Sequence, residues 1–421
     1  MKISKIGSFA GALVMCAAPL FADPLPTGDA EALGFDTDRL AKLDATLNGL
    51  IDKGTFPGAV VMIARDGQLA HLSAMGKRSP EGAEMTQDSI FRIYSMTKPI
   101  TTAAAMTLVE EGKLDLSYPL AAYLPEFANM TVATGEMDSD GKMITTTANR
   151  PITIQDLMRH TSGITYGFFG AGPVREAYNA AQVTNMDLDN TAHAALIASL
   201  PLEHQPGTTW EYSRSTDILG AVIEKVTGQP LIDALHARIF DPLGMEDTGF
   251  YVTDPAKQDR IAEPFAGDDK IGPLPLFDPR VEKAQQSGGG GLTSTIHDYS
   301  RFAQMMLNGG ALDGVRILSP KTVQLMTSDH MGGITPGKYY LPGNGYGFGL
   351  GYGVRVSAGN STLPGTVGDY YWGGAAGTYY YADPAEDMFV LLMIQSPNNR
   401  VPVRSVLKNV VAAAMADSHI D

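Results

Sequence analysis

Segments with strand character lie at both ends of this chain, and segments with helical periodicity lie between them. Near the N-terminus, two β-rich runs flank the turn residues Arg65, Asp66 and Gly67, which predicts a hairpin. Near the C-terminus, GYGFGLGYGVRV is followed by TYYYADPAEDMFVLLMIQ, in which Pro384 marks a second predicted hairpin. The simplest arrangement places both ends in one sheet and the helices in an inserted unit.

The predicted fold class is therefore α+β. A sheet domain would comprise residues 23–105 and 290–421, and a mainly helical domain would comprise residues 106–289. Polar composition indicates irregular structure in two segments, 130–150 and 253–290. Alternate glycines from Gly347 to Gly353 predict one strand with a face that lacks side chains, which suits close packing better than a ligand. Helical spacing and end signals predict helices at 96–111, 153–159, 191–199, 215–227, 231–239, after Thr295 and near 402–415.

The first 22 residues resemble a secretory signal peptide. Lys2 and Lys5 precede a short apolar run and then small residues, which predicts cleavage after Ala22 and a periplasmic or secreted protein. An uncleaved anchor helix is the alternative, although the run is short for a membrane span. Cys16 is the only cysteine, so the mature chain would contain no disulfide. A lipoprotein modification of Cys16 is disfavoured because bulky Met15 precedes it.

The charge of the mature chain excludes some partners. Removal of Lys2 and Lys5 leaves 29 basic and 46 acidic residues, and the basic residues form no cluster. Nucleic acid is therefore not expected as a partner. No later segment has 18 uninterrupted apolar residues, so no stable membrane insertion is expected after signal cleavage. The oligomeric state is unknown at this stage.

Ser95 and Lys98 stand at the beginning of a predicted helix, directly before Pro99. Proline is tolerated only where the helix N–H groups have no partner, so the helix must begin close to Ser95. Lys98 then lies on the same helix face as Ser95, and a nearby lysine can help to activate a serine hydroxyl. An ordinary helix-capping serine is the alternative. Ser139 and Lys142 have the same spacing but lie in an acidic turn-like segment.

Signatures of other hydrolases are missing from the sequence. The chain contains no G-x-S-x-G motif, which argues against an α/β-hydrolase nucleophile. His160 is the best candidate for a histidine-based triad, but a structural role is favoured because no nucleophile stands near it in the sequence. No histidine spacing indicates a metal site, and no cofactor is expected.

Six segments together resemble serine hydrolases related to class C β-lactamases and penicillin-binding proteins. The chain is most similar to the β-lactamase-like carboxylesterases known as family VIII. This resemblance implies a β-lactamase/transpeptidase-like fold, in which helices flank an antiparallel sheet. In chain order the segments are YSMTK, LMRHTSGI, PGTTWEYSRSTDILGAVIEKVTG, DPLGM, SGGGGLTSTIHDYSRFAQMMLNGG and YYWGGAAGTYYYADP.

The resemblance implies roles for individual residues. Ser95 would be the acylated nucleophile, Lys98 its proton partner, and Tyr212 the phenolate or hydrogen-bond relay that accepts the serine proton and later activates water. Trp372, Gly373 and Gly374 would occupy the position of the K-T-G strand motif that closes the site. The backbone N–H groups of Ser95 and Ala375 would form the oxyanion hole.

Two departures from the class C pattern bear on the substrate. Arg214 stands where those enzymes have asparagine, two residues after the tyrosine, and Trp372 replaces the lysine of the closing motif. An indole in place of a cation favours a neutral, partly apolar substrate over a β-lactam.

The predicted function is hydrolysis of short- to medium-chain esters, with a small-molecule ester as substrate. The alternatives are a β-lactamase, a D-aminopeptidase or amide hydrolase, an acyltransferase, and a penicillin or peptidoglycan binder that does not turn over.

Overall fold

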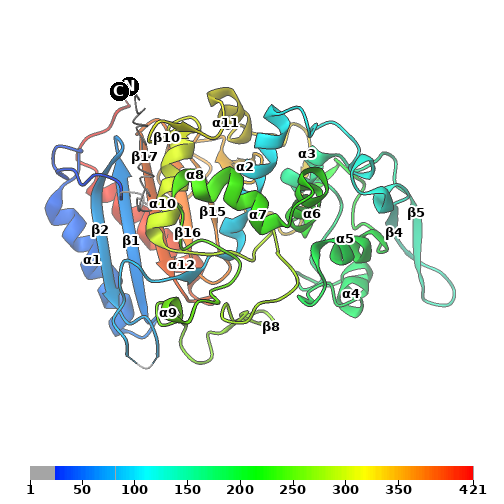
Figure 1. Cartoon of the computed structure of the whole chain (residues 1–421), viewed down its shortest axis with the longest axis horizontal. Coiled ribbons are helices and arrows are strands. Elements are labelled where there is room, and N and C mark those ends of the chain that lie inside the picture. The colour runs from blue at the N-terminus through cyan, green and yellow to red at the C-terminus, as the bar shows by residue number, and fades with distance from the viewer. Residues whose placement is uncertain (1–23, 81, 421) are drawn as a thin grey trace, which may run out of the picture.

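A seven-stranded antiparallel sheet joins the two ends of the chain, as predicted for an α+β fold (Figure 1). The computed structural model describes residues 24–80 and 82–420, so the predicted signal segment lies outside the described residues. The strand order is β13-β14-β15-β16-β17-β1-β2, in which N-terminal β1 pairs with C-terminal β17. These strands are β1 (Gly58–Arg65), β2 (Gln68–Gly76), β13 (Tyr346–Phe348), β14 (Gly353–Arg355), β15 (Tyr370–Gly373), β16 (Tyr379–Asp383) and β17 (Met388–Ile394).

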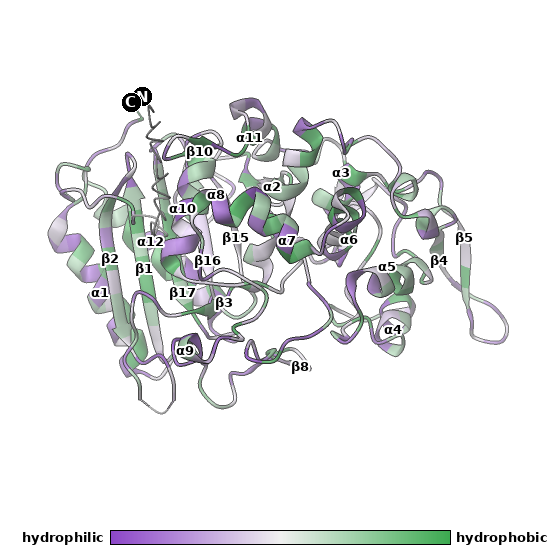
Figure 2. Ribbon diagram, viewed as in Figure 1, coloured by the Kyte–Doolittle hydropathy of each residue, from purple (hydrophilic) through white to green (hydrophobic). Residues whose placement is uncertain are grey.

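Both faces of the central strands are covered by helices. Val61 and Ile63 of β1 pack in the core beneath α1 (Thr37–Asp52) and α12 (Arg400–Ala414). Val60 and Met62 point to the opposite face, where α10 (Ile296–Leu307) and α2 (Thr97–Glu110) contribute to the main core. Because successive strand residues alternate between faces and both faces are covered, β1 is apolar from Ala59 to Ala64, and Figure 2 shows it mainly in the hydrophobic colour.

The helical part of the chain lies beside the sheet (Figure 1). Helix α6 begins and ends at the predicted residues and stops at Gly228, whose φ of 70° places it in the left-handed region. The other helices of this part are α3 (Ile154–Met158), α4 (Pro173–Ala180), α5 (Asn190–Ala198), α6 (Ser215–Thr227), α7 (Leu231–Leu235), η4 (His236–Phe240) and α8 (Asp241–Leu243). The predicted domain boundaries near residues 105 and 290 stay predictions.

The structure corrects two expectations about local structure and adds one helix. The segment 130–150 is not irregular, because β4 (Thr131–Met137) and β5 (Met143–Thr147) form a ribbon that projects from the body (Figure 1). Helix α1 lies in an N-terminal segment for which no element was predicted. The alternating glycines form the hairpin β13–β14 and not one strand, with a left-handed turn at Gly351. These glycines do pack closely, because a Cβ at Gly347 would collide with the Asp329 carboxylate.

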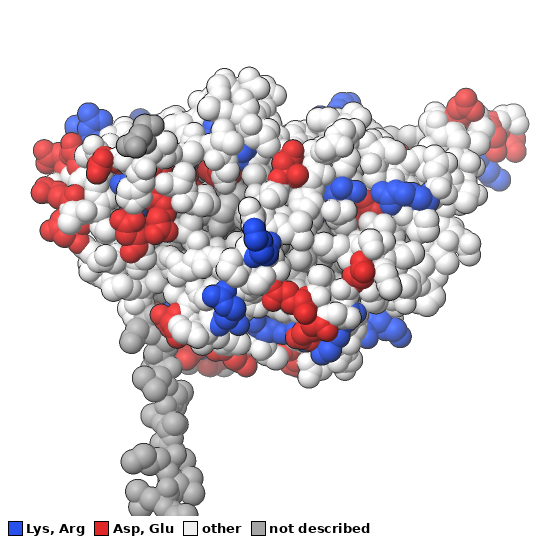
Figure 3. Space-filling model, turned by 90° about the horizontal axis from the view of Figure 1, so that it is seen from above, with Lys and Arg blue, Asp and Glu red and all other residues white. Residues whose placement is uncertain are grey.

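Short elements complete the described chain. They are β3 (Phe91–Arg92), η1 (Tyr94–Met96), η2 (Leu120–Ala122), η3 (Pro125–Phe127), β6 (Thr209–Trp210), α9 (Pro255–Gln258), β7 (Lys270–Ile271), β8 (Leu274–Pro275), β9 (Thr293–Ser294), β10 (Ala311–Leu312), β11 (Val315–Arg316), α11 (Pro320–Met326) and β12 (Thr335–Pro336). No helix within residues 24–80 and 82–420 is long and apolar enough to cross a membrane. Figure 3 shows acidic side chains gathered at the end of the molecule that carries α1 and β2, with basic side chains dispersed over the same face.

Candidate active site

Ser95 lies in a single 3-10 turn that leads directly into α2. Tyr94, which begins this turn, has a φ of 42°, and the α-helix starts at Thr97. Pro99 is therefore the third residue of α2, where its missing N–H removes no helical hydrogen bond. The structure thus places the Ser95 hydroxyl at the positive end of a 14-residue helix.

Lys98 is completely buried beneath Ser95. Its ammonium group donates to the Ser95 hydroxyl (Nζ–Oγ 3.4 Å), to the Tyr166 hydroxyl (3.2 Å) and to the Gly289 carbonyl oxygen (2.5 Å). An ammonium group has three N–H donors, so these three acceptors satisfy it. The four consecutive glycines that begin at Gly288 thereby supply the backbone that holds the lysine.

The charges around Lys98 keep it protonated. Burial alone would lower the pKa of Lys98, but Tyr166, Tyr212 and Asp217 outweigh burial and raise this pKa above its ordinary value. Burial likewise opposes ionisation of Asp217, yet Arg214, His193 and Lys98 hold the pKa of Asp217 below its ordinary value. Burial raises the pKa of Tyr166 to about 12, although Lys98 acts in the opposite direction. The site thus contains an ammonium group, a carboxylate and a neutral Tyr166 phenol.

Tyr212 is held against Lys98 by other aromatic side chains. The Lys98 Nζ lies 4.7 Å from the centre of the Tyr212 ring. Trp372 donates from its indole Nε1 to the Tyr212 hydroxyl (3.3 Å), while the Trp210 indole stacks on the Tyr212 ring with 5.9 Å between ring centres. These contacts fix the phenol in position, and both indoles are buried.

His160 supports this aromatic cluster and does not face Ser95. Its ring packs against the Tyr212 ring with 4.8 Å between centres, and its Nδ1 lies 3.3 Å from the Ser213 hydroxyl. Burial and the Lys98 charge hold the pKa of His160 well below its ordinary value, so the imidazole is neutral. This arrangement agrees with the structural role favoured for His160.

The segment after β15 approaches Ser95 closely. A Cβ at Gly374 would collide with the Ile93 carbonyl oxygen and with the Thr378 hydroxyl, so glycine is needed where this segment passes the chain just before Ser95. A Cβ at Gly373 would similarly meet the Arg404 guanidinium at 2.6 Å. Ala375, which follows Gly374, lines the same cavity as Ser95.

That cavity has a volume of about 480 Å³ and an apolar wall. Trp372, predicted to close the site, is not among the residues that line it, whereas Arg214, Tyr166 and Asp217 are. The segment 270–278, which contains the hairpin β7–β8, forms one side of it. Apolar side chains in the wall include Phe168, Phe169, Met186, Leu274, Leu276 and Phe277.

Sequence reasoning missed Tyr166 and Asp217. Asp217 accepts hydrogen bonds from the Ser287 hydroxyl and from the Gly289 N–H, so it braces the backbone that binds Lys98. Its position in the first turn of α6, five residues after Tyr212, was the available signal. Tyr166 carried no local signal, because its contact with Lys98 depends on how the chain folds.

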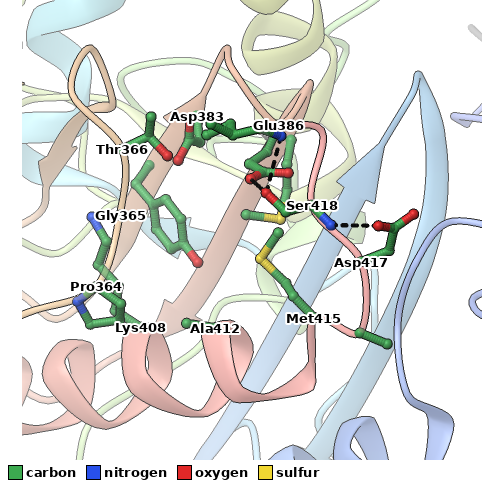
Figure 4. Close-up of a pocket in the computed structure, with 14 residues that line it drawn as sticks. Pro364, Gly365, Thr366, Asp383, Glu386, Lys408, Ala412, Met415, Asp417 and Ser418 are labelled. Carbon is green, nitrogen blue, oxygen red and sulfur yellow. Dashed lines mark hydrogen bonds between the residues drawn. The ribbon is translucent and has the colours of Figure 1, made fainter.

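Neither Ser139 nor a cavity near the C-terminus competes with this site. Ser139 lies in the exposed turn of the β4–β5 ribbon. A cavity of about 560 Å³ lies between the C-terminal segment, β16 and α12, and none of the predicted site residues lines it (Figure 4). Within the described part of the chain, no group of three or more His, Cys, Asp or Glu residues could hold a metal ion.

Comparisons with known proteins identify the family to which the chain belongs. Protein Rv1367c from Mycobacterium tuberculosis (strain ATCC 25618 / H37Rv) is 39% identical, over 83% of this chain and 88% of its own length. Esterase EstB from Burkholderia gladioli is 32% identical, over 87% of this chain and 93% of its own. The solved structure of EstCE1, described as a hydrolase with promiscuous acyltransferase activity, has a TM-score of 0.74 and 28% identity, and the match covers 90% of this chain and 99% of that one. The Beta-lactamase family model matches residues 43–415, and the chain therefore belongs to the beta-lactamase family of serine hydrolases.

Proposed function

We propose that this protein is a secreted or periplasmic esterase that cleaves short- to medium-chain carboxylic esters through an acyl-serine intermediate. The observation that carries the proposal is the convergence of Ser95, Lys98 and Tyr212 at one end of an apolar cavity. The name of the relative EstB, an esterase, supports the same reaction. The lysine-rich start and apolar run of residues 1–22 support secretion.

In the first half of the reaction, Tyr212 acts as a phenolate: the Ser95 oxygen attacks the ester carbonyl carbon while the phenolate takes the serine proton and becomes a neutral phenol. The Lys98 ammonium and the Trp372 N–H stabilise the negative charge that the phenolate carries before this transfer. The backbone N–H groups of Ser95 and Ala375 bind the oxyanion of the tetrahedral intermediate. This intermediate collapses when the C–O bond breaks, and Tyr212 returns the proton to the departing alcohol.

In the second half, water hydrolyses the acyl-serine. Tyr212 accepts a proton from the water, whose oxygen attacks the acyl carbonyl, and the same N–H groups bind the second oxyanion. Collapse releases the carboxylic acid and returns the proton to the Ser95 oxygen. The cavity of about 480 Å³ suits acyl chains of modest length, and its apolar wall offers contacts to such a chain.

Hydrolysis of 4-nitrophenyl butyrate by the mature protein tests this proposal. Ser95→Ala should lower kcat by at least about a thousandfold, and Ser139→Ala, at the same S-x-x-K spacing, should leave it unchanged. Intact-mass measurement after rapid quenching should show one acyl adduct in the wild type and none in Ser95→Ala.

Steady turnover of the ester is required for the proposal. A burst of one product per protein, with no further turnover, would contradict an esterase and support a non-turnover binder. Equal hydrolysis by wild type and Ser95→Ala would contradict the site itself. Faster turnover of the cephalosporin nitrocefin than of any ester would support a β-lactamase.

A further inference from the structure

Arg214 lines the cavity that contains Ser95. It occupies the N-cap position of α6, two residues after Tyr212, without a side-chain capping hydrogen bond, and its side chain is only 11% exposed. Its guanidinium carbon lies 5.2 Å from the centre of the Tyr166 ring, whose hydroxyl contacts Lys98. Arg214 and Ser95 both line the cavity, so a bound substrate can contact both residues.

The hydrogen-bonding capacity of this guanidinium group is not used within the described part of the chain. The buried Nε has no hydrogen-bond partner there. The Asp217 Oδ2 lies 3.6 Å from Nη1, which is too far for a good hydrogen bond, and the Oδ2 also has no hydrogen-bond partner. A buried donor without an acceptor costs free energy, so an acceptor supplied by a ligand would be bound favourably.

The charge balance around Arg214 identifies the class of acceptor. Lys98 and Arg214 are two cations beside the single carboxylate of Asp217. At the rim, Lys283 pairs with Asp187 and Asp278 pairs with Arg280, so those charges are already compensated. An anionic group on the substrate would neutralise the remaining positive charge, and a planar carboxylate matches the geometry of arginine donors.

We propose that Arg214 binds a carboxylate group carried by the substrate, so that the preferred substrates are esters with a free carboxylate in the acyl or the alcohol part. This inference rests on the proposed esterase activity and changes its expected substrate. Trp372 suggested a neutral substrate from the sequence, but the indole is turned to Tyr212 and does not line the cavity, so it does not set the charge preference.

Matched substrate pairs test the inference. For the acyl side, kcat/KM is measured for mono(4-nitrophenyl) glutarate and for 4-nitrophenyl butyrate. For the alcohol side, it is measured for 4-acetoxybenzoate and 4-acetoxybenzamide. Arg214→Gln should lower the charged-to-neutral ratio at least about tenfold in one of the two pairs, mainly through KM, and Arg214→Lys should restore part of it.

Two control variants separate the contact from general charge effects. The double variant Arg214→Gln/Asp217→Asn removes both charges of the ion pair, so the local net charge stays the same. Its charged-to-neutral ratio of kcat/KM should fall as much as that of Arg214→Gln. Lys283→Gln removes a cation from the rim and should leave the ratio unchanged.

An unchanged ratio in Arg214→Gln for both pairs would overturn the inference. An equal fall of the charged-to-neutral ratio in Lys283→Gln would also overturn it, because the substrate carboxylate would then respond to the overall charge of the cavity and not to Arg214. Failure of the wild type to hydrolyse any of the four esters would instead refute the proposed esterase, so the two failures are distinguishable.

Discussion

Trp372→Phe separates two interpretations of the tryptophan in the closing motif. If the indole binds substrate, as the motif position suggests, its loss should change KM and the preference for acyl length. In the structure its Nε1 donates to the Tyr212 hydroxyl at 3.3 Å, and the side chain does not line the cavity. Its loss should then lower kcat for all esters alike.

The size of the effect follows from the charge on the Tyr212 oxygen. A buried hydrogen bond to a neutral hydroxyl contributes about 1 kcal/mol, or roughly fivefold in rate, whereas one to a charged acceptor contributes about 1.5–3 kcal/mol. Because the proposed base is the Tyr212 phenolate, whose negative charge the Trp372 N–H stabilises, Trp372→Phe makes this basic form less accessible and should lower kcat about 10- to 100-fold. The assay is steady-state hydrolysis of 4-nitrophenyl acetate, butyrate and hexanoate.

The other tryptophan of this chain provides the control. Trp210 also packs on Tyr212 and is buried, but its Nε1 has no hydrogen-bond partner among the described residues. Trp210→Phe therefore removes a similar volume beside the same phenol without removing a donor, and it should lower kcat much less. Thermal unfolding of both variants checks that their stabilities are comparable. Equal losses of kcat, or a change of acyl-length preference in Trp372→Phe alone, would refute the reasoning.

Three further outcomes are expected. Gly374→Ala should lower kcat at least about tenfold, because the new Cβ would collide with the Ile93 carbonyl beside the proposed oxyanion hole, whereas Gly359→Ala, where a Cβ meets nothing within 4 Å, should leave kcat unchanged. Burial raises the pKa of Asp298 to about 6, so between about pH 4 and 6 the folded protein holds this proton more tightly than the unfolded chain. The free energy of unfolding of the wild type should therefore fall by up to about 3 kcal/mol as the pH rises across that range. Thermal unfolding at pH 4 and pH 7 should show this loss in the wild type and not in Asp298→Asn. Intact-mass measurement of protein exported by a bacterial host should give a chain that begins at Asp23.

Turns and helix ends were predicted correctly where the backbone conformation of one or two residues determines them. The Asp66–Gly67 turn requires left-handed backbone, which both residues adopt, and Gly228 ends α6 for the same reason. The β4–β5 ribbon was missed because its residues are mostly exposed and threonine-rich, so no apolar alternation marks the strands. Helix α1 has the apolar residues Leu40, Leu43 and Leu47 at helical spacing, which was an available signal.

The candidate site was predictable only where its residues are close in sequence. Ser95 and Lys98 are related by one helical turn, so their contact follows from the position of Pro99. The role of Trp372 depends on strand alternation, which buries its side chain and leaves Ala375, beyond the strand end, at the cavity. Tyr166 reaches Lys98 from a distant segment, and no sequence pattern encodes that approach.

The direction of the Lys98 pKa bears on which group removes the serine proton. The hydrogen bonds of Lys98 fit either form of the amine, because a neutral amine could donate to Gly289 and Tyr166 and still accept from Ser95. The electrostatic environment decides between them. Burial opposes the charge on Lys98, but the neighbouring Tyr166, Tyr212 and Asp217 outweigh it and raise the pKa of Lys98, so the lysine is an ammonium ion at neutral pH and has no lone pair to offer. A base must then be found elsewhere, and the proposed base is the Tyr212 oxygen, where the Trp372 N–H and the Lys98 charge stabilise negative charge.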